Sequence, residues 1–77
     1  MEIRETQIED ILVNAPVLTK RILSLEDEPR LIGRQIFIPS GRLDMLYAYK
    51  TKFLLIELKV APFDKNLFIK FYIINKI

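Results

Sequence analysis

Hydrophobic residues in the first part of the chain recur at the spacing of an α-helix. Four apolar positions at i, i+3, i+4 and i+7 form one stripe, which consists of Ile8, Ile11, Leu12 and Ala15. The stripe predicts a helix over Glu2–Asn14, and Thr6 with Glu9 forms a capping box at which its regular part begins. Pro16 ends or kinks this helix, and residues 17–25 are expected to add a further turn or two.

Three segments that follow an acidic loop at residues 26–29 have the composition of β-strands. They are rich in β-branched, aromatic and other apolar residues, and turn-forming residues separate them. The predicted strands are Leu31–Ile38, Arg42–Tyr49 and Lys52–Val60. Residues 39–41 form the first turn, and a hairpin loop of two or four residues joins the second and third strands.

This hairpin brings four polar residues onto one face of the predicted sheet. If the loop is centred on residues 50–51, residues whose numbers add up to 101 lie opposite each other. Asp44 then lies opposite Glu57, with Cβ atoms roughly 4.5–5.5 Å apart. Arg42 lies opposite Lys59 on the same face, because residues two apart in a strand share a face. The flanking positions on both faces are apolar, as in a central strand pair that is covered on each side.

The two neighbouring carboxylates of this quartet indicate a metal site. Asp44 and Glu57 repel each other, and apolar surroundings penalise both charges. A divalent cation relieves both costs, and the Leu58 carbonyl with water completes an oxygen shell. Lys59 is placed to orient the attacking water and Arg42 to bind a phosphate. The alternative is a pair of diagonal salt bridges, from Arg42 to Glu57 and from Asp44 to Lys59, with no metal.

The amino-acid composition limits which metal ions and ligands this site can use. The 77 residues include no cysteine and no histidine, so thiolate and imidazole ligands are excluded and a metal must be held by oxygen. Oxygen ligands favour Mg²⁺ or Mn²⁺, and the net charge of +2 is compatible with a nucleic-acid partner. No apolar stretch approaches the roughly 20 residues of a membrane span. We therefore expect one cytoplasmic domain over residues 1–77 without a membrane partner.

Two strings carry a resemblance to a known family. The segments PSGRLDML at residues 39–46 and LIELK at residues 55–59 resemble the PD-(D/E)xK nuclease superfamily. Within it, the chain is most similar to the C-terminal catalytic domain of archaeal NucS-type endonucleases and related RecB-like nucleases. The family pattern is a glycine, a hydrophobic residue, Asp and two apolar residues, then a strand that ends in Glu-x-Lys. The similarity covers roughly residues 3–65.

The resemblance implies an α+β (α/β) fold with a restriction-endonuclease-like core. The expected order is a helix, a three-stranded antiparallel meander and a second helix, and the final strand or strands of the family are lacking. Residues 1–77 would then be a single truncated or minimal nuclease-like domain. From Asp64 onward the sequence favours two structures, because Asp64 is a suitable cap for a helix whereas FIKFYII is rich in strand formers. The resemblance favours the helix.

The resemblance also implies a set of site residues. Asp44, Glu57 and Lys59 would be catalytic, and Asp44, Glu57 and the Leu58 carbonyl would hold Mg²⁺ or Mn²⁺. The family has a further acid on the first helix, for which Glu5 is the candidate and Glu9 the cap. Members commonly carry a glutamine on the second helix, and here its place falls on Ile69 or Lys70. The residues expected to contact DNA are Arg42, Lys70, Tyr49, Lys50 and Lys52.

The function implied is a metal-dependent DNA endonuclease that hydrolyses phosphodiester bonds with a metal-activated water. The missing glutamine and the short chain leave an alternative, a catalytically incomplete nuclease-fold protein that acts as a DNA-binding or assembly module. In either case we expect a homodimer that covers an open sheet edge.

Overall fold

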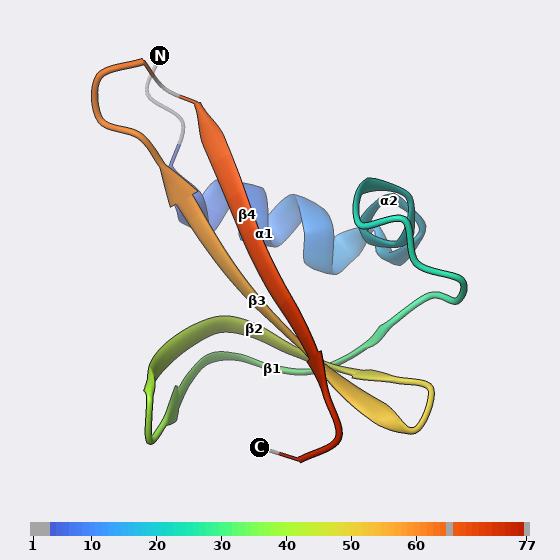
Figure 1. Ribbon diagram of the computed structural model, residues 1–77. Coiled ribbons are helices and arrows are strands. Elements are labelled where there is room, and N and C mark those ends of the chain that lie inside the picture. The colour runs from blue at the N-terminus through green and yellow to red at the C-terminus, as the bar shows by residue number, and fades with distance from the viewer. Residues whose placement is uncertain (1–3, 65, 77) are drawn as a thin grey trace.

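The computed structural model describes residues 4–64 and 66–76 and has an α+β fold. Two helices precede an open, four-stranded antiparallel sheet with the strand order β1-β2-β3-β4, and in Figure 1 both helices lie on the same side of that sheet. The elements are α1 (Glu5–Asn14), α2 (Pro16–Ile22), β1 (Arg30–Ile38), β2 (Gly41–Tyr49), β3 (Lys52–Val60) and β4 (Leu67–Ile74). Neither described helix is long and apolar enough to cross a membrane.

The start of α1 differs from the prediction. Arg4 occupies the N-cap position, and its backbone N–H donates to the Gln7 side-chain oxygen over 2.8 Å. The capping box predicted from Thr6 and Glu9 is therefore wrong, because Glu9 lies in the interior of the helix and is buried. The predicted first residue, Glu2, lies outside the described residues.

The buried face of α1 is also rotated from the predicted stripe. Ile8, Leu12 and Val13 pack against the core, whereas Ile11 is 57% exposed. Glu9 fills the remaining buried position, so the helix turns a carboxylate toward the sheet in place of an isoleucine. Burial of a charged group is tolerated only where partners satisfy it, and those partners come from β1.

A short break separates the two helices. Pro16 begins α2 at the first helical position, where its missing N–H costs nothing. The buried Thr19 hydroxyl donates to the Leu12 carbonyl over 3.0 Å, which joins the second helix to the last turn of the first. The expected extra turns after Pro16 are therefore confirmed, and they end at Ile22.

The register predicted for the central hairpin is confirmed. Tyr49 pairs with Lys52 and Met45 with Ile56, so residue numbers add up to 101 around a loop of two residues. Lys50 adopts φ 55°, as the first residue of a tight hairpin turn often requires. The Asp44–Glu57 pair would come next, but the ladder between β2 and β3 ends at Met45 and Ile56.

The helix expected from Asp64 is wrong, because Leu67–Ile74 is the strand β4. It pairs with β3 from Val60 opposite Leu67 to Phe53 opposite Ile74. β-branched and aromatic residues dominate this segment, and the outer edge of β3 offers them a full row of hydrogen-bonding partners. The observed order is thus helix, helix and four strands, in place of a three-stranded meander between two helices.

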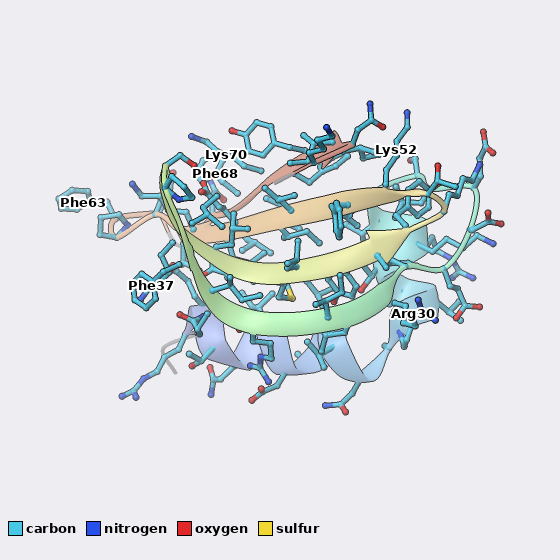
Figure 2. The ribbon with its side chains drawn as sticks, turned by 90° about the horizontal axis from the view of Figure 1, so that it is seen from below. Arg30, Phe37, Lys52, Phe63, Phe68 and Lys70 are labelled. Atoms are coloured by element: carbon cyan, nitrogen blue, oxygen red, sulfur yellow. The ribbon has the colours of Figure 1, made fainter. Side chains whose placement is uncertain are left out.

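The sheet has a hydrophobic cluster on each face. Between the helices and the sheet lie the buried side chains of Leu12, Leu23, Met45, Tyr47, Tyr49, Leu54, Ile56 and Leu58. On the opposite face Leu43, Leu46 and Leu55 are buried, although no described helix covers them. Strong curvature of the sheet, visible in Figure 2, and half-buried neighbours such as Ile36 and Ile74 shield this second cluster. Both faces of the central hairpin are therefore apolar, as predicted.

Candidate active site

An open cleft of ≈ 570 Å³ lies between the first turn of α1 and the ends of β2, β3 and β4. Its lining residues are Glu5, Arg42, Asp44, Glu57, Leu58, Lys59, Phe68, Ile69 and Lys70. The cleft thus brings together seven of the predicted site residues, and they come from four separate elements. Ile69 and Lys70 reach it from β4, which is not the element predicted for them.

Asp44 is the most deeply placed acid of the cleft, with 9% of its surface exposed. Its Oδ2 accepts a hydrogen bond of 2.6 Å from the Leu58 N–H. This bond continues the connection between β2 and β3 beyond the last backbone pair, because a side-chain carboxylate takes the place of a backbone carbonyl. Asp44 is therefore fixed to the strand that carries Glu57 and Lys59.

The alternation of side chains along β2 is interrupted at Asp44. Leu43 packs with Leu46 on the uncovered face, whereas Met45 packs beneath the helices. In a regular strand Leu43 and Met45 would share one face. The interruption coincides with the end of the backbone ladder, and it frees the Asp44 carboxylate to bond to the backbone of β3.

The remaining charged groups of the cleft are not paired with one another. Glu57 is half-buried, while Arg42, Lys59 and Lys70 are exposed. Among the described residues no ion pair involves Arg42, Asp44, Glu57 or Lys59. The two diagonal salt bridges that the sequence left as an alternative are therefore not formed. The Glu57 carboxylate and the Lys59 ammonium remain free to bind other groups.

Two acids of α1 lie near this region in different settings. Glu5, the residue proposed from the sequence as the acid of the first helix, is half-buried and lines the cleft. Glu9, one turn further, is 1% exposed and accepts hydrogen bonds from Arg34 Nε over 3.0 Å and Gln35 Nε2 over 2.8 Å. Neither Arg34 nor Gln35 is among the site residues predicted from the sequence. Their sequence signal is weak, because two polar residues in an edge strand are ordinary.

Arg34 is held by two acids of α1. Its Nη2 donates to Asp10 over 2.7 Å and its Nε donates to Glu9. Hydrogen bonds to Asp10 and then to Glu9 raise the pKa of Arg34 above its usual value. The guanidinium charge compensates the buried Glu9 carboxylate.

Three residues predicted to contact DNA lie away from the cleft, at the β2–β3 turn. Tyr49 is buried, and its hydroxyl accepts a hydrogen bond of 2.9 Å from the Glu26 N–H. The Lys50 ammonium is paired with the Glu26 carboxylate, which raises the pKa of Lys50. In Figure 2 Lys52 lies at the opposite end of the molecule from Lys70. The structure thus assigns Tyr49 and Lys50 to internal contacts.

The donor set of the cleft fits a small, hard cation. Asp44, Glu57 and Glu5 supply carboxylate oxygens and Leu58 supplies a backbone carbonyl, and the chain contains no cysteine and no histidine. Within the described residues no three acidic side chains converge closely enough to form a preformed metal cluster. Mg²⁺ commonly binds through one or two carboxylates together with water and substrate phosphates, so a complete protein cage is not required.

Comparison with known protein families, with curated proteins and with solved structures finds no match to this chain.

Proposed function

We propose that this chain is the metal-binding core of a PD-(D/E)xK nuclease with a restriction-endonuclease-like fold, and that it cleaves DNA endonucleolytically with Mg²⁺ or Mn²⁺. The observation that carries the proposal is the convergence of Asp44, Glu57 and Lys59 in one cleft without ion pairs among them. The resemblance of LIELK and PSGRLDML to the family patterns supports it independently.

Each residue of the cleft has a role in this proposal. Asp44, Glu57 and the Leu58 carbonyl hold the cation, and Glu5 adds a carboxylate at the rim. The cation, when bound, polarises the phosphate and lowers the pKa of a water molecule. The exposed Lys59 ammonium orients the attacking water and offsets negative charge on the phosphate. Arg42 and Lys70 bind phosphates on either side of the scissile bond.

DNA cleavage by the purified wild-type chain tests this proposal. Single-stranded, flapped and branched DNA is incubated with Mg²⁺ or Mn²⁺, and a parallel reaction contains EDTA. We expect cleavage with either cation and none with the chelator, because Asp44 and Glu57 alone cannot polarise the phosphate. Cleavage that survives EDTA would contradict the proposal.

One feature favours the second candidate function, a catalytically incomplete module that binds DNA. The family glutamine lies on a helix, whereas the corresponding position is Ile69 or Lys70 in the strand β4. Lys70 lines the cleft and is exposed, so it supplies a cation for a phosphate in place of an amide. Salt-sensitive binding of DNA without cleavage under any metal condition would support this candidate.

We also propose that a second copy of the chain pairs along β4. The outer edge of β4 has exposed apolar residues and one charge, Lys70. The other edge, β1, is interrupted by a register shift between Leu31 and Gly33 and by the positive φ of Gln35. Such irregularities protect an edge from pairing with another strand. β4 is therefore the edge that is open to a partner.

The hydrogen bonds of β4 specify how two copies would pair. The Ala61 N–H donates to the Asn66 carbonyl over 2.9 Å, so even-numbered residues of β4 turn their backbone groups toward β3 and odd-numbered ones turn outward. If two β4 strands pair antiparallel with Phe71 on the two-fold axis, the outward N–H and C=O groups of one copy lie opposite those of the other and can form hydrogen bonds. This pairing places Ile69 opposite the partner's Ile73 and Lys70 opposite the partner's Tyr72, so the two lysines avoid each other.

Phe71→Lys tests this pairing. Two ammonium groups would meet at the two-fold axis, so we expect the dimer to dissociate into monomers while the melting temperature of the monomer changes little. Molar mass from light scattering over a range of concentrations is the measurement. Phe63→Lys, at an exposed position outside β4, is the matched control and should stay dimeric. A wild-type chain that is monomeric at every concentration would exclude the pairing.

A further inference from the structure

Gln35 has an unusual backbone conformation for its place in the fold. It lies within the strand β1, yet its φ is 52°, in the left-handed region that residues with side chains rarely adopt. Its neighbours Arg34 and Ile36 pair regularly with Met45 and Leu43 of β2. Gln35 itself lies between these pairs, across from Asp44. Such a local irregularity persists only where surrounding contacts favour it.

The side-chain amide of Gln35 connects two acids. Its Nε2 donates to Glu9 Oε2 over 2.8 Å, and the same nitrogen lies 3.4 Å from Asp44 Oδ1. An amide nitrogen carries two hydrogens, so one group can serve both carboxylates. Glu9 is fixed in turn by Arg34, which also bonds to Asp10. A continuous set of contacts therefore runs from α1 through β1 to the cleft.

We propose that Gln35 is a positioning residue for Asp44, held in a left-handed conformation so that its amide bridges the buried Glu9 and the Asp44 carboxylate. This inference depends on the proposed function, in which Asp44 is a metal ligand. With Oδ2 bonded to the Leu58 N–H and Oδ1 facing Gln35, both carboxylate oxygens have defined orientations. Outer partners of this kind orient a ligand and increase its affinity for the metal.

A different explanation is that the conformation at Gln35 serves only to bend the edge strand. Gln35→Asn separates the two explanations. Asparagine adopts the left-handed region more readily than glutamine, so the backbone is retained or stabilised. Its side chain is one methylene shorter, so its amide cannot reach Glu9 and Asp44 together.

The experiment compares Mn²⁺ affinity, DNA cleavage and thermal unfolding for wild type and Gln35→Asn. We expect an unchanged or higher melting temperature, together with a loss of about 10–100-fold in Mn²⁺ affinity and in cleavage rate. Glu9→Gln should reduce Mn²⁺ affinity similarly, and the double variant should lose little more, because both changes break the same link. Wild-type Mn²⁺ affinity in Gln35→Asn would overturn the proposal.

A readout without metal separates this inference from the proposed function. In nitrogen-15 spectra of the metal-free chain, we expect the side-chain amide of Gln35 to exchange slowly with water and to shift in Asp44→Asn. A chain that shows this behaviour but never cleaves DNA would retain the link and exclude the nuclease. Rapid exchange of the Gln35 amide, with no response to Asp44→Asn, would exclude the link.

Discussion

Glu57→Gln should lower the rate of DNA cleavage by at least about 100-fold. Glutamine keeps the shape of the side chain but removes its negative charge, so the cleft holds a divalent cation poorly. A bound cation contributes several kcal/mol of charge stabilisation in the transition state, and each 1.36 kcal/mol corresponds to a factor of ten in rate. Glu57 has no ion-pair partner among the described residues, so the substitution removes a metal ligand without breaking a salt bridge.

Single-turnover cleavage over a range of metal concentrations, from subsaturating upward, measures this effect. Glu28→Gln is the matched control, because Glu28 is an exposed acid in the loop before β1 and lies outside the cleft. We expect the control to cleave like wild type and both variants to unfold at the wild-type temperature. Equal cleavage by wild type and Glu57→Gln would show that the activity comes from a contaminating enzyme.

Leu54→Ala should destabilise the chain by about 2–5 kcal/mol. Leu54 is 0% exposed in the cluster beneath the helices, and it lies opposite Tyr47 in the central hairpin. Truncation removes buried methyl groups and leaves a cavity that a closely packed core fills only in part. A small domain has a total stability of only about 5–15 kcal/mol, so this single change removes a large share of it.

Urea unfolding followed by circular dichroism measures this loss. Phe37→Ala is the control, because Phe37 is 82% exposed and projects from the end of the sheet in Figure 2. We expect the control to change the free energy of unfolding by less than about 0.5 kcal/mol. A similar loss of unfolding free energy in both variants would contradict the assignment of Leu54 to the hydrophobic core.

The register of the central hairpin could be predicted from the sequence for a physical reason. Side chains of a strand alternate with a period of two, so one assumption about the loop fixes every opposite pair. The apolar flanks made any other register costly, because a slip by one residue would expose Leu54 and Ile56 and bury Lys59. The observed pairs Met45–Ile56 and Tyr49–Lys52 follow that register.

The last element could not be predicted because local preference and family resemblance disagreed. Phe68–Ile74 has the composition of a strand, and the structure follows that preference. The neighbouring strand decides between helix and strand, because the edge of β3 that faces away from β2 provides hydrogen-bonding partners for the whole of β4. A preference for strand is realised when such a partner exists, and no local pattern reports that partner.

Glu9 and Gln35 could not be predicted because their roles depend on contacts distant in sequence. Hydropathy assigns a glutamate to the solvent, but Arg34 and Gln35 supply donors that make its burial favourable. Residue 35 has a left-handed backbone but is a glutamine, whereas glycine and asparagine are the residues that usually indicate this conformation in a sequence. The contacts of Glu9 with Arg34 and Gln35 therefore form only when α1 packs against β1.

Binding of Mn²⁺ to the wild-type chain, followed residue by residue in amide spectra, tests the central claim most directly. The paramagnetic ion broadens the signals of nearby amides. We expect the signals of Asp44, Glu57 and Leu58 to broaden first, and this broadening to disappear in Asp44→Asn. Broadening that is centred on the exposed acids of residues 26–28, or that is unchanged in Asp44→Asn, would contradict a metal site in the cleft.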